Sequence, residues 1–264
     1  MTSTMLGGKT ALVTGSTSGI GLGIARALAA QGANVVFNGF GDAAEIAKLQ
    51  ADVAAEFGVQ TAYHNADMSK PAEIEAMVAF ASDKFGGVDV LVNNAGIQFV
   101  ANVEDFPIEK WDAILAINLS SAFHTTRLLL PQMKARNWGR IINLASAHGL
   151  VASAQKSAYV AAKHGLIGLT KVTALETAQT GVTANAICPG FVLTPLVQKQ
   201  VDARAARDGI SNEQAKHALL ADKQPSGEFV TPEELGALAV FMCSAAANQV
   251  RGVAWNMDGG WVAQ

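Results

Sequence analysis

Cysteine is scarce in this chain. Only Cys188 and Cys243 occur among the 264 residues, and they lie far apart in the sequence. We expect both to be reduced thiols in the core, one in a strand and one in a helix. No cysteine stands at a metal-ligand spacing from another cysteine or from a histidine, so the sequence indicates no catalytic metal.

Charged residues are also few, at 16% of the chain, and the net charge of -3 includes no basic run. A nucleic-acid partner is therefore not expected. No continuous apolar stretch has the length of a membrane span, and the first eight residues lack the basic and apolar parts of a signal peptide. These absences favour a cytoplasmic protein with no membrane partner.

Hydrophobic residues, in contrast, make up 50% of the chain. They form short strand-like runs that alternate with longer helical stretches: 9–14, 34–38, 60–64, 88–93, 140–144, 182–188 and 254–257. This alternation predicts an α/β fold with right-handed crossovers and a doubly wound, parallel, seven-stranded sheet. The length suits one domain over residues 1–264.

One segment, from about residue 194 to 224, departs from this alternation because it is helical in pattern but polar. We interpret it as a lid over a substrate. The alternative is a solvated helical pair with no closing role.

A glycine-rich turn follows the first predicted strand. Gly15, Gly19 and Gly21 have the spacing G-x-x-x-G-x-G and lead directly into a helical pattern. Glycine permits a tight turn there, a close approach of the backbone to a pyrophosphate, and close packing of helix on strand. The helix N-terminus would then receive the phosphates. The pattern predicts a dinucleotide site, although a glycine cluster alone can be an ordinary loop.

Tyr159 and Lys163 are four residues apart, and Ser146 precedes Tyr159 by thirteen. On a helix, this spacing places the phenol and the ammonium on one face. A nearby cation favours phenolate, so Tyr159 is a candidate acid/base for an alcohol or ketone. Taken alone, the pair is a weak signal, because Tyr and Lys at this spacing are more often on a solvated helix face.

Together these motifs resemble the short-chain dehydrogenase/reductase family over nearly the whole chain. The further matching positions are Asp67, Asn94, Ala95, Gly96, Asn118, Pro189, Gly190 and Thr194. The resemblance implies a Rossmann fold, a nicotinamide cofactor and a homotetramer. The implied cofactor-binding residues are Gly15, Thr17, Ser18, Gly19, Ile20, Gly21, Phe40, Asp67, Met68, Asn94, Ala95, Gly96, Tyr159, Lys163, Pro189, Gly190, Val192 and Thr194.

The resemblance also implies roles for four catalytic residues. Tyr159 would exchange the hydroxyl proton, and Lys163 would hold the nicotinamide ribose and lower the pKa of the phenol. Ser146 would bind the substrate oxygen. Asn118 would anchor a water in the proton path, or, alternatively, be a buried amide that bends a helix.

The end of the second predicted strand indicates NAD rather than NADP. A 2′-phosphate needs a cation, and residues 38–42 contain no Lys or Arg, while Ser18 precedes Gly19. No acid stands at the strand end either. Asn38, Phe40, a backbone group or Asp42 would therefore have to meet the ribose.

Four polar residues around the predicted catalytic group indicate the substrate. Gln98, His148, Lys156 and Gln200 combine one cation, two amides and an imidazole, which suits a carboxylate. Each could instead be a loop, core or surface residue. Within the family, the resemblance is to members that oxidise (R)-3-hydroxybutyrate to acetoacetate with NAD, and it implies a small hydroxy acid as the substrate.

Three aromatic or apolar positions complete the expected pocket. Trp261 is a candidate wall contributed by a neighbouring subunit. Related enzymes commonly have Trp where this chain has Phe191 and often Arg where it has Leu193, so the pocket could be wider and admit a longer acid.

Other functions stay open at this point. A 3-oxoacyl carrier-protein reductase of the same family would want NADPH and a basic surface, which residues 18 and 38–42 do not support. A dinucleotide-sensing protein would have no need of intact Ser146, Tyr159 and Lys163. A purely structural interaction protein has still less support. Small residues on the helix of Tyr159, among them Ala161 and Gly168, would allow either a subunit contact or close packing within the chain.

Overall fold

The computed structural model describes residues 4–263, apart from the side chain of Leu196. Seven strands form one sheet in the order β3-β2-β1-β4-β5-β6-β7, and every neighbouring pair is parallel. The predicted α/β fold and seven-stranded sheet are therefore confirmed. The strands are β1 (Thr10–Val13), β2 (Asn34–Asn38), β3 (Thr61–His64), β4 (Val90–Asn93), β5 (Gly139–Leu144), β6 (Val182–Pro189) and β7 (Ala254–Met257).

Helices cover both faces of the sheet, so the central strands β1, β4, β5 and β6 are buried along their whole length. The helices are α1 (Gly19–Ala30), α2 (Ala43–Phe57), α3 (Pro71–Phe85), α4 (Ile108–Leu115), α5 (Ser121–Ala135), α6 (Ser157–Glu176), α7 (Pro195–Asp208), α8 (Asn212–Ala221) and α9 (Pro232–Cys243). Shorter turns are η1 (Ala116–Ser120), η2 (Ala147–Gly149), η3 (Ala245–Ala247) and η4 (Trp261–Ala263).

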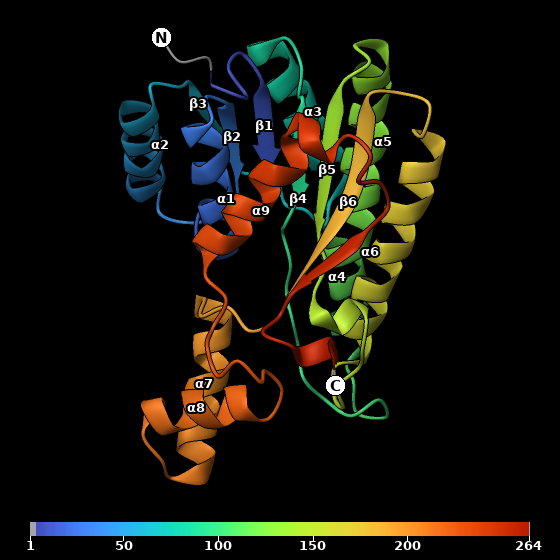
Figure 1. Ribbon diagram of the computed structural model, residues 1–264. Helices are drawn as coiled ribbons and strands as arrows, with labels where there is room; N and C mark the ends of the chain where they lie inside the picture. The colour runs from blue at the N-terminus through green and yellow to red at the C-terminus, as the bar shows by residue number, and fades with distance from the viewer. Residues whose placement is uncertain (1–3, 264) are drawn as a thin grey trace.

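The two helical layers have separate cores. On one face, α1 and α9 lie against each other in front of the sheet (Figure 1), with Ile24, Leu28 and Leu235 in the buried cluster. On the other face, Ile74 of α3 and Leu129 of α5 belong to a second cluster. The sheet is therefore packed on both sides, as a doubly wound fold requires.

One connection departs from the expected handedness. The crossovers from β4 to β5 and from β5 to β6 use helices on the α3–α6 face. The connection from β6 to β7 continues in the same direction across the sheet, but its helix α9 packs on α1 at the opposite face. This crossover is left-handed, so the predicted right-handed crossovers do not extend to the last connection. The connection first passes through α7 and α8, so it is not a simple strand-helix-strand unit.

Both cysteines lie where the sequence placed them. Cys188 is in β6 and Cys243 is the last residue of α9, and both are buried free thiols. Burial raises the pKa of Cys188 to about 11 and that of Cys243 to about 12. Both are therefore protonated, unreactive core residues at neutral pH.

The stretch Ile108–Ala135, which includes α4 and α5, is long and apolar enough by composition to cross a membrane. In this fold, Ile114, Leu129 and Met133 of that stretch are fully buried within the protein. Their apolar side chains serve the packing of these helices in the core.

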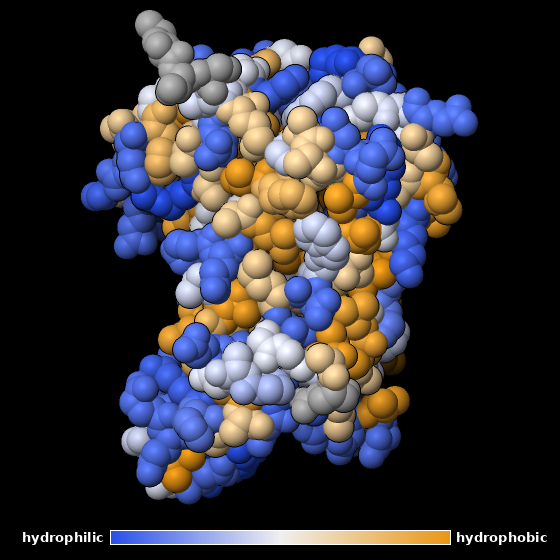
Figure 2. Space-filling model, in the orientation of Figure 1, coloured by the Kyte–Doolittle hydropathy of each residue, from blue (hydrophilic) through white to orange (hydrophobic). Residues whose placement is uncertain are grey.

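The polar segment predicted from about residue 194 to 224 forms the helical pair α7 and α8. This pair extends beyond the carboxyl ends of the strands (Figure 1), and its outer surface is mostly hydrophilic (Figure 2). Side chains of Thr194 and Ser211 cap the two helices. At the base of the pair, the side-chain amide of Gln224 accepts from the Phe191 amide and donates to the carbonyl of Glu228.

The small residues of α6 divide between two surroundings. Ala158 and Ala162 are fully buried beside Ile114 of α4, so close packing within the chain accounts for them. Ala161 and Gly168 are exposed and remain available to a second subunit.

Candidate active site

A cleft of about 340 Å³ lies at the carboxyl ends of the strands. Its walls come from the loops after β1 and β4, where the order of the strands reverses direction, which is the usual place for a nucleotide in such a sheet. The lining residues are Gly15, Ser18, Gly19, Ile20, Asn94, Ala95, Gly96, Leu144, Ala145, Tyr159, Lys163, Pro189, Thr194 and Pro195. Eleven of these fourteen were predicted as cofactor ligands.

The glycine turn has the geometry that its sequence predicts. Gly15 and Gly19 have φ of 61° and 57°, a region that other residues rarely adopt, and α1 begins at Gly19. A Cβ on Gly21 would overlap the carbonyl oxygen of Gly15, so this third glycine allows the helix to pack on the turn. The N-cap residue Ser18 makes no side-chain capping bond, so the first amides of α1 are available to phosphates. These features fit a dinucleotide.

Asn94 holds the glycine turn in place. Its side-chain nitrogen donates to the carbonyls of Thr14 and Gly15, each at 2.9 Å. The Thr14 hydroxyl accepts from the amides of Asn94 and Ala95, each at 3.0 Å. Thr14 was not among the predicted site residues, and a polar residue at the carboxyl end of an otherwise apolar strand was the signal for it.

The side chains of Asn38 and Asp42 differ in how far they are occupied. The Asn38 oxygen accepts from the Gly15 amide at 3.2 Å, and its nitrogen donates to the carbonyls of His64 and Ala66. Asp42 caps α2 by accepting from two backbone amides. Asn38 is buried, whereas Asp42 is exposed and both of its bonds use the same carboxylate oxygen. The suggestion that the Asn38 side chain meets the ribose was therefore wrong, while Asp42, Phe40, which is 68% exposed, and backbone groups stay candidates.

The loops around this end of the cleft are tied together. The Thr17 hydroxyl donates to the Phe40 carbonyl at 3.1 Å. Asp67 accepts from both the amide and the hydroxyl of Ser69, which lowers the pKa of its carboxyl group. Met68 has its side chain buried in the core rather than in the cleft. Thr17, Phe40, Asp67 and Met68 thus shape the loops but do not line the cleft described above.

Tyr159 and Lys163 meet the cleft from α6, as predicted. The Lys163 ammonium donates to the Leu144 carbonyl at 2.6 Å and lies 5.5 Å from the centre of the Tyr159 ring. Burial lowers the pKa of Lys163 to about 8. Burial also raises the pKa of Tyr159, while hydrogen bonding with Ser146 acts in the opposite direction. Burial is the larger of these two effects, and the expected lowering of the Tyr159 pKa by Lys163 is not seen.

Ser146 follows β5 and is nearly buried. Its oxygen accepts from the His148 amide at 3.1 Å, so its own proton is left to donate to another acceptor. Ser146 and Tyr159 line one cavity, which is the arrangement needed to hold one substrate oxygen.

Asn118 is buried in the short π-helix η1 between α4 and α5. Its side chain accepts from the amide of Ile97 and donates to the carbonyl of the same residue, both at 2.9 Å. The amide therefore holds the loop after Gly96 against the helix. This is the buried-amide alternative, and the role in anchoring a water stays a prediction.

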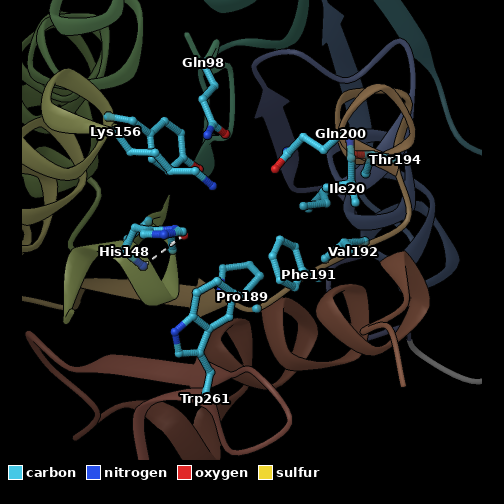
Figure 3. Close-up of a pocket in the computed structure, with 15 residues that line it drawn as sticks. Ile20, Gln98, His148, Lys156, Pro189, Phe191, Val192, Thr194, Gln200 and Trp261 are labelled. Atoms are coloured by element: carbon cyan, nitrogen blue, oxygen red, sulfur yellow. Dashed lines mark hydrogen bonds between the residues drawn. The ribbon is translucent and has the colours of Figure 1, made fainter. Parts of the chain in front are cut away.

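A second cavity, of about 100 Å³, adjoins the cleft, and Tyr159 lines both. Figure 3 shows Gln98, His148, Lys156 and Gln200 directed into it from different sides. The full lining is Ile20, Gln98, Ala145, Ser146, His148, Lys156, Tyr159, Pro189, Gly190, Phe191, Val192, Thr194, Val197, Gln200 and Trp261. The four residues predicted to bind a carboxylate are therefore brought together.

The cavity has both apolar and polar lining residues, and none of the lining residues is acidic. The side-chain nitrogen of Gln98 is buried without a hydrogen-bond partner among residues 4–263. Lys156 is half-buried and makes no ion pair with the described part of the chain. Burial and the charge of Lys223 lower the pKa of Lys156. A bound anion would accept hydrogen bonds from the Gln98 and Lys156 nitrogens and so satisfy both groups.

His148 is buried at the floor of the cavity, where its Nε2 lies 2.9 Å from the Ser153 hydroxyl. Burial, together with the smaller effects of the charges of Lys156 and Lys223, lowers its pKa to about 3. The imidazole is therefore neutral at working pH and can hydrogen-bond a substrate without charge.

Aromatic rings close the other side. Trp261 is 5.0 Å from the His148 ring and 4.9 Å from the Phe191 ring, between ring centres. Trp261 of the same chain thus lines the cavity, and the expectation that a neighbouring subunit contributes this wall was wrong, because Trp261 packs on Phe191 and His148 of its own chain. Leu193 is exposed and does not line the cavity.

Several lining residues were not predicted. Leu144, Ala145, Pro195 and Val197 contribute backbone or small apolar surface. Their residue types carry no signal of their own, although each lies within three residues of a predicted one. Within residues 4–263, no group of three or more His, Cys, Asp and Glu side chains is arranged to hold a metal ion.

Comparison with known proteins agrees with this geometry. The family described as short chain dehydrogenase matches residues 9–205. The chain belongs to the short-chain dehydrogenase family. Members of this family are oxidoreductases that use a nicotinamide dinucleotide, and this chain is one of them.

Relatives are similar over nearly their whole length. A D-beta-hydroxybutyrate dehydrogenase of Cupriavidus necator is 74% identical over 260 residues, which cover 98% of this chain and 100% of that protein. A D-beta-hydroxybutyrate dehydrogenase of Rhizobium meliloti is 56% identical, covering 97% of this short-chain dehydrogenase and 99% of the relative. The crystal structure of L-sorbose reductase from Gluconobacter frateurii, complexed with NADPH and L-sorbose, has a TM-score of 0.94 at 30% identity and covers 99% of each chain.

Proposed function

We propose that this protein catalyses the reversible oxidation of (R)-3-hydroxybutyrate by NAD⁺ to acetoacetate, NADH and a proton. One observation carries the proposal: Ser146 and Tyr159 share a small cavity with Lys156, Gln98, Gln200 and His148, and no acidic residue lines it. The names of the two relatives, both D-beta-hydroxybutyrate dehydrogenases, support the same substrate.

The carboxylate of the substrate would occupy the side of the cavity with unsatisfied donors. Lys156 supplies a charge and Gln98 a buried N–H group that lacks a partner in the described chain. Charge-assisted hydrogen bonds are the strongest of this kind and favour an anion over a neutral alcohol. The aromatic wall of Phe191 and Trp261 limits the remaining space, which supports a short acid rather than the longer one that the sequence left open.

Around the reacting carbon, each protein group has a separate task. The nicotinamide accepts the hydride when bound. Ser146 donates a hydrogen bond to the substrate oxygen and holds it beside Tyr159. Tyr159 takes the hydroxyl proton during oxidation and returns it during reduction. Lys163, anchored on the Leu144 carbonyl, holds a positive charge beside the phenol and favours the phenolate that forms.

NAD is the proposed cofactor rather than NADP. The loop after β2 presents an exposed Phe40 and no Lys or Arg where a 2′-phosphate would need a cation. The occupied Asn38 side chain leaves the ribose to backbone groups beside Phe40 or to the exposed carboxylate of Asp42.

We also propose that the α7–α8 pair is a lid and that the protein is a cytoplasmic homotetramer. Gln200 of α7 already lines the cavity, so movement of the pair would change substrate access. Phe123 of α5 and Val172 of α6 are large apolar side chains exposed on neighbouring helices, as a subunit contact would require. Light scattering after size-exclusion chromatography tests the oligomer.

The function is tested by following NADH formation with purified protein. (R)-3-hydroxybutyrate with NAD⁺ should be turned over far faster than the (S) enantiomer or than the same acid with NADP⁺. Activity confined to neutral alcohols or thioesters would agree with the fold and with the role of Tyr159 but would contradict the carboxylate site. Binding of NADH without any turnover would favour the dinucleotide-sensing alternative.

A further inference from the structure

Gln155, immediately before Lys156, has an unusual backbone conformation. Its φ is 65°, in the left-handed region, and Asn137 is the other non-glycine residue between 4 and 263 with a positive φ. Glutamine has no local reason to adopt this conformation, which costs on the order of 1 kcal/mol. Surrounding contacts must therefore hold it.

Those contacts join Gln155 to the loop that follows Gln98. Its carbonyl accepts from the Ala101 amide at 3.0 Å. Its side-chain nitrogen donates to the side-chain oxygen of Asn102 at 3.1 Å. Ala101 and Asn102 belong to the loop that carries Gln98, so Gln155 connects the two loops that supply Gln98 and Lys156.

The same loop has a second anchor on the other side of Gln98. Ile97 is held by both ends of the Asn118 amide. Gln98 thus lies between a fixed Ile97 and an Ala101–Asn102 turn fixed by Gln155. Its buried nitrogen has no protein partner among the described residues, so its position is set by these anchors rather than by a bond of its own.

The loop of Gln155 is also anchored at the floor of the cavity. Ser153, two residues earlier, lies 2.9 Å from Nε2 of His148. Lys156 then follows as the N-cap residue of α6, with its side chain in the cavity (Figure 3). The left-handed turn at Gln155 directs the chain from the His148 contact to the start of this helix.

We propose that Gln155 is a positioning residue that sets the distance between Gln98 and Lys156, and thereby the fit of the substrate carboxylate. Gln155 is exposed and does not line the cavity, so it acts through these two residues. The inference rests on the proposed function. Small displacements of binding groups lower the rate of an enzyme strongly, which makes a connection of this kind measurable.

The first test is Gln155→Gly, because glycine adopts the left-handed conformation freely and keeps the carbonyl that Ala101 binds. Only the side-chain bond to Asn102 is lost. We expect KM for (R)-3-hydroxybutyrate to rise roughly three- to tenfold, the equivalent of one hydrogen bond. NAD affinity and kcat should stay near their wild-type values.

A double-mutant cycle separates loss of the Gln155–Asn102 hydrogen bond from a general loss of structure in the two loops. Asn102→Ala should raise KM as much as Gln155→Gly, and the double variant no more than either one. The double variant Gln155→Asn with Asn102→Gln exchanges the two side chains. Their combined length is unchanged, so their hydrogen bond can form and KM should return to the wild-type value. In a Lys156→Met background, Gln155→Gly should have little further effect.

Asn137→Gly is the matched control. Asn137 is also left-handed, with φ of 50°, and its side chain accepts from the Gly181 amide, a contact outside both cavities. This variant should lower Tm without changing KM for the acid. The positioning role would be overturned, while the proposed function stands, by either of two results. One is an unchanged KM in Gln155→Gly, and the other is a full further rise in KM when Gln155→Gly is combined with Lys156→Met. A wild-type protein that does not oxidise the acid would overturn the proposed function itself.

Discussion

The cofactor cleft and the substrate cavity adjoin at Tyr159 but are built differently. In the cleft, polar side chains are already bonded: Asn94 to the glycine turn, Asn38 to three backbone groups and Lys163 to the Leu144 carbonyl. In the cavity, Gln98 has a buried donor without a partner and Lys156 has no acid beside it within residues 4–263. The first site is a rigid backbone surface, whereas the second has groups that only a ligand can satisfy.

This difference predicts which changes affect chemistry, recognition and stability. Loss of Tyr159, at the junction of the cleft and the cavity, should affect turnover. Loss of Gln98 or Lys156, whose donors await a ligand, should affect only the binding of the acid. The largest effect is expected at the junction itself.

Tyr159→Phe should lower kcat roughly a thousandfold, because the proton acceptor of the reaction is removed. NADH binding, measured by fluorescence titration, should persist because the ring still lines the cleft. Tyr63 is the one other tyrosine in the chain, and its hydroxyl donates to the Gly39 carbonyl. Tyr63→Phe should keep most of kcat. Near-normal turnover in Tyr159→Phe would remove this residue from the acid/base role.

Lys156→Met keeps the apolar stem of the side chain but removes its charge. KM for (R)-3-hydroxybutyrate should rise roughly ten- to a hundredfold, as expected for one charge-assisted hydrogen bond. NAD affinity should not change, since Lys156 lines only the substrate cavity. Lys199→Met, at an exposed lysine of α7, is the control. Equal effects of the two variants would contradict the carboxylate site.

His148 should make the protein sensitive to acid. Its pKa is about 3 in the folded protein, against 6.5 in the unfolded chain. Between these values the unfolded chain binds a proton that the folded protein does not, so stability falls as the pH is lowered through this window. At about pH 5 the loss is roughly 2 kcal/mol.

His148→Gln should remove that loss, because glutamine does not titrate. Urea unfolding near neutral pH and near pH 5 measures the difference between variant and wild type. His217→Gln, at an exposed histidine of α8, should leave the pH dependence as it is. An equally steep loss of stability in His148→Gln would mean that other groups cause it.

Phe40→Arg should have the smallest effect, an improvement of about tenfold in kcat/KM with NADP⁺, as for one bond to the 2′-phosphate. Rates with NAD⁺ should change little, because Phe40 is exposed and the glycine turn is held by other residues. Competition between the two cofactors measures the change. No gain with NADP⁺ would show that the 2′ position lies elsewhere.

The cleft was predictable from sequence because glycine spacing and strand order determine backbone geometry. The predicted strands 34–38 and 254–257 coincide with β2 and β7, and the others differ by one or two residues at their ends. The left-handed crossover before β7 was not predictable, since it depends on which face α9 packs against after a long connection. Local periodicity carries no information about that choice.

The cavity was predictable in its residue types but not in all its geometry. Gln98, His148, Lys156 and Gln200 were expected to converge, and they do. The origin of Trp261 in the same chain and the bonding of Asn38 depend on tertiary contacts between distant segments. The conformation of Gln155 gave no signal, because nothing in its residue type indicates a positive φ.

The most direct test of the account compares two substrates that differ only in charge. kcat/KM is measured for (R)-3-hydroxybutyrate and for its methyl ester with NAD⁺, in the wild-type protein and in Lys156→Met. The account predicts that the wild type prefers the acid at least roughly tenfold and that Lys156→Met loses most of this preference by losing rate with the acid. Equal rates for acid and ester in the wild type would contradict a carboxylate held by the free donors of the cavity.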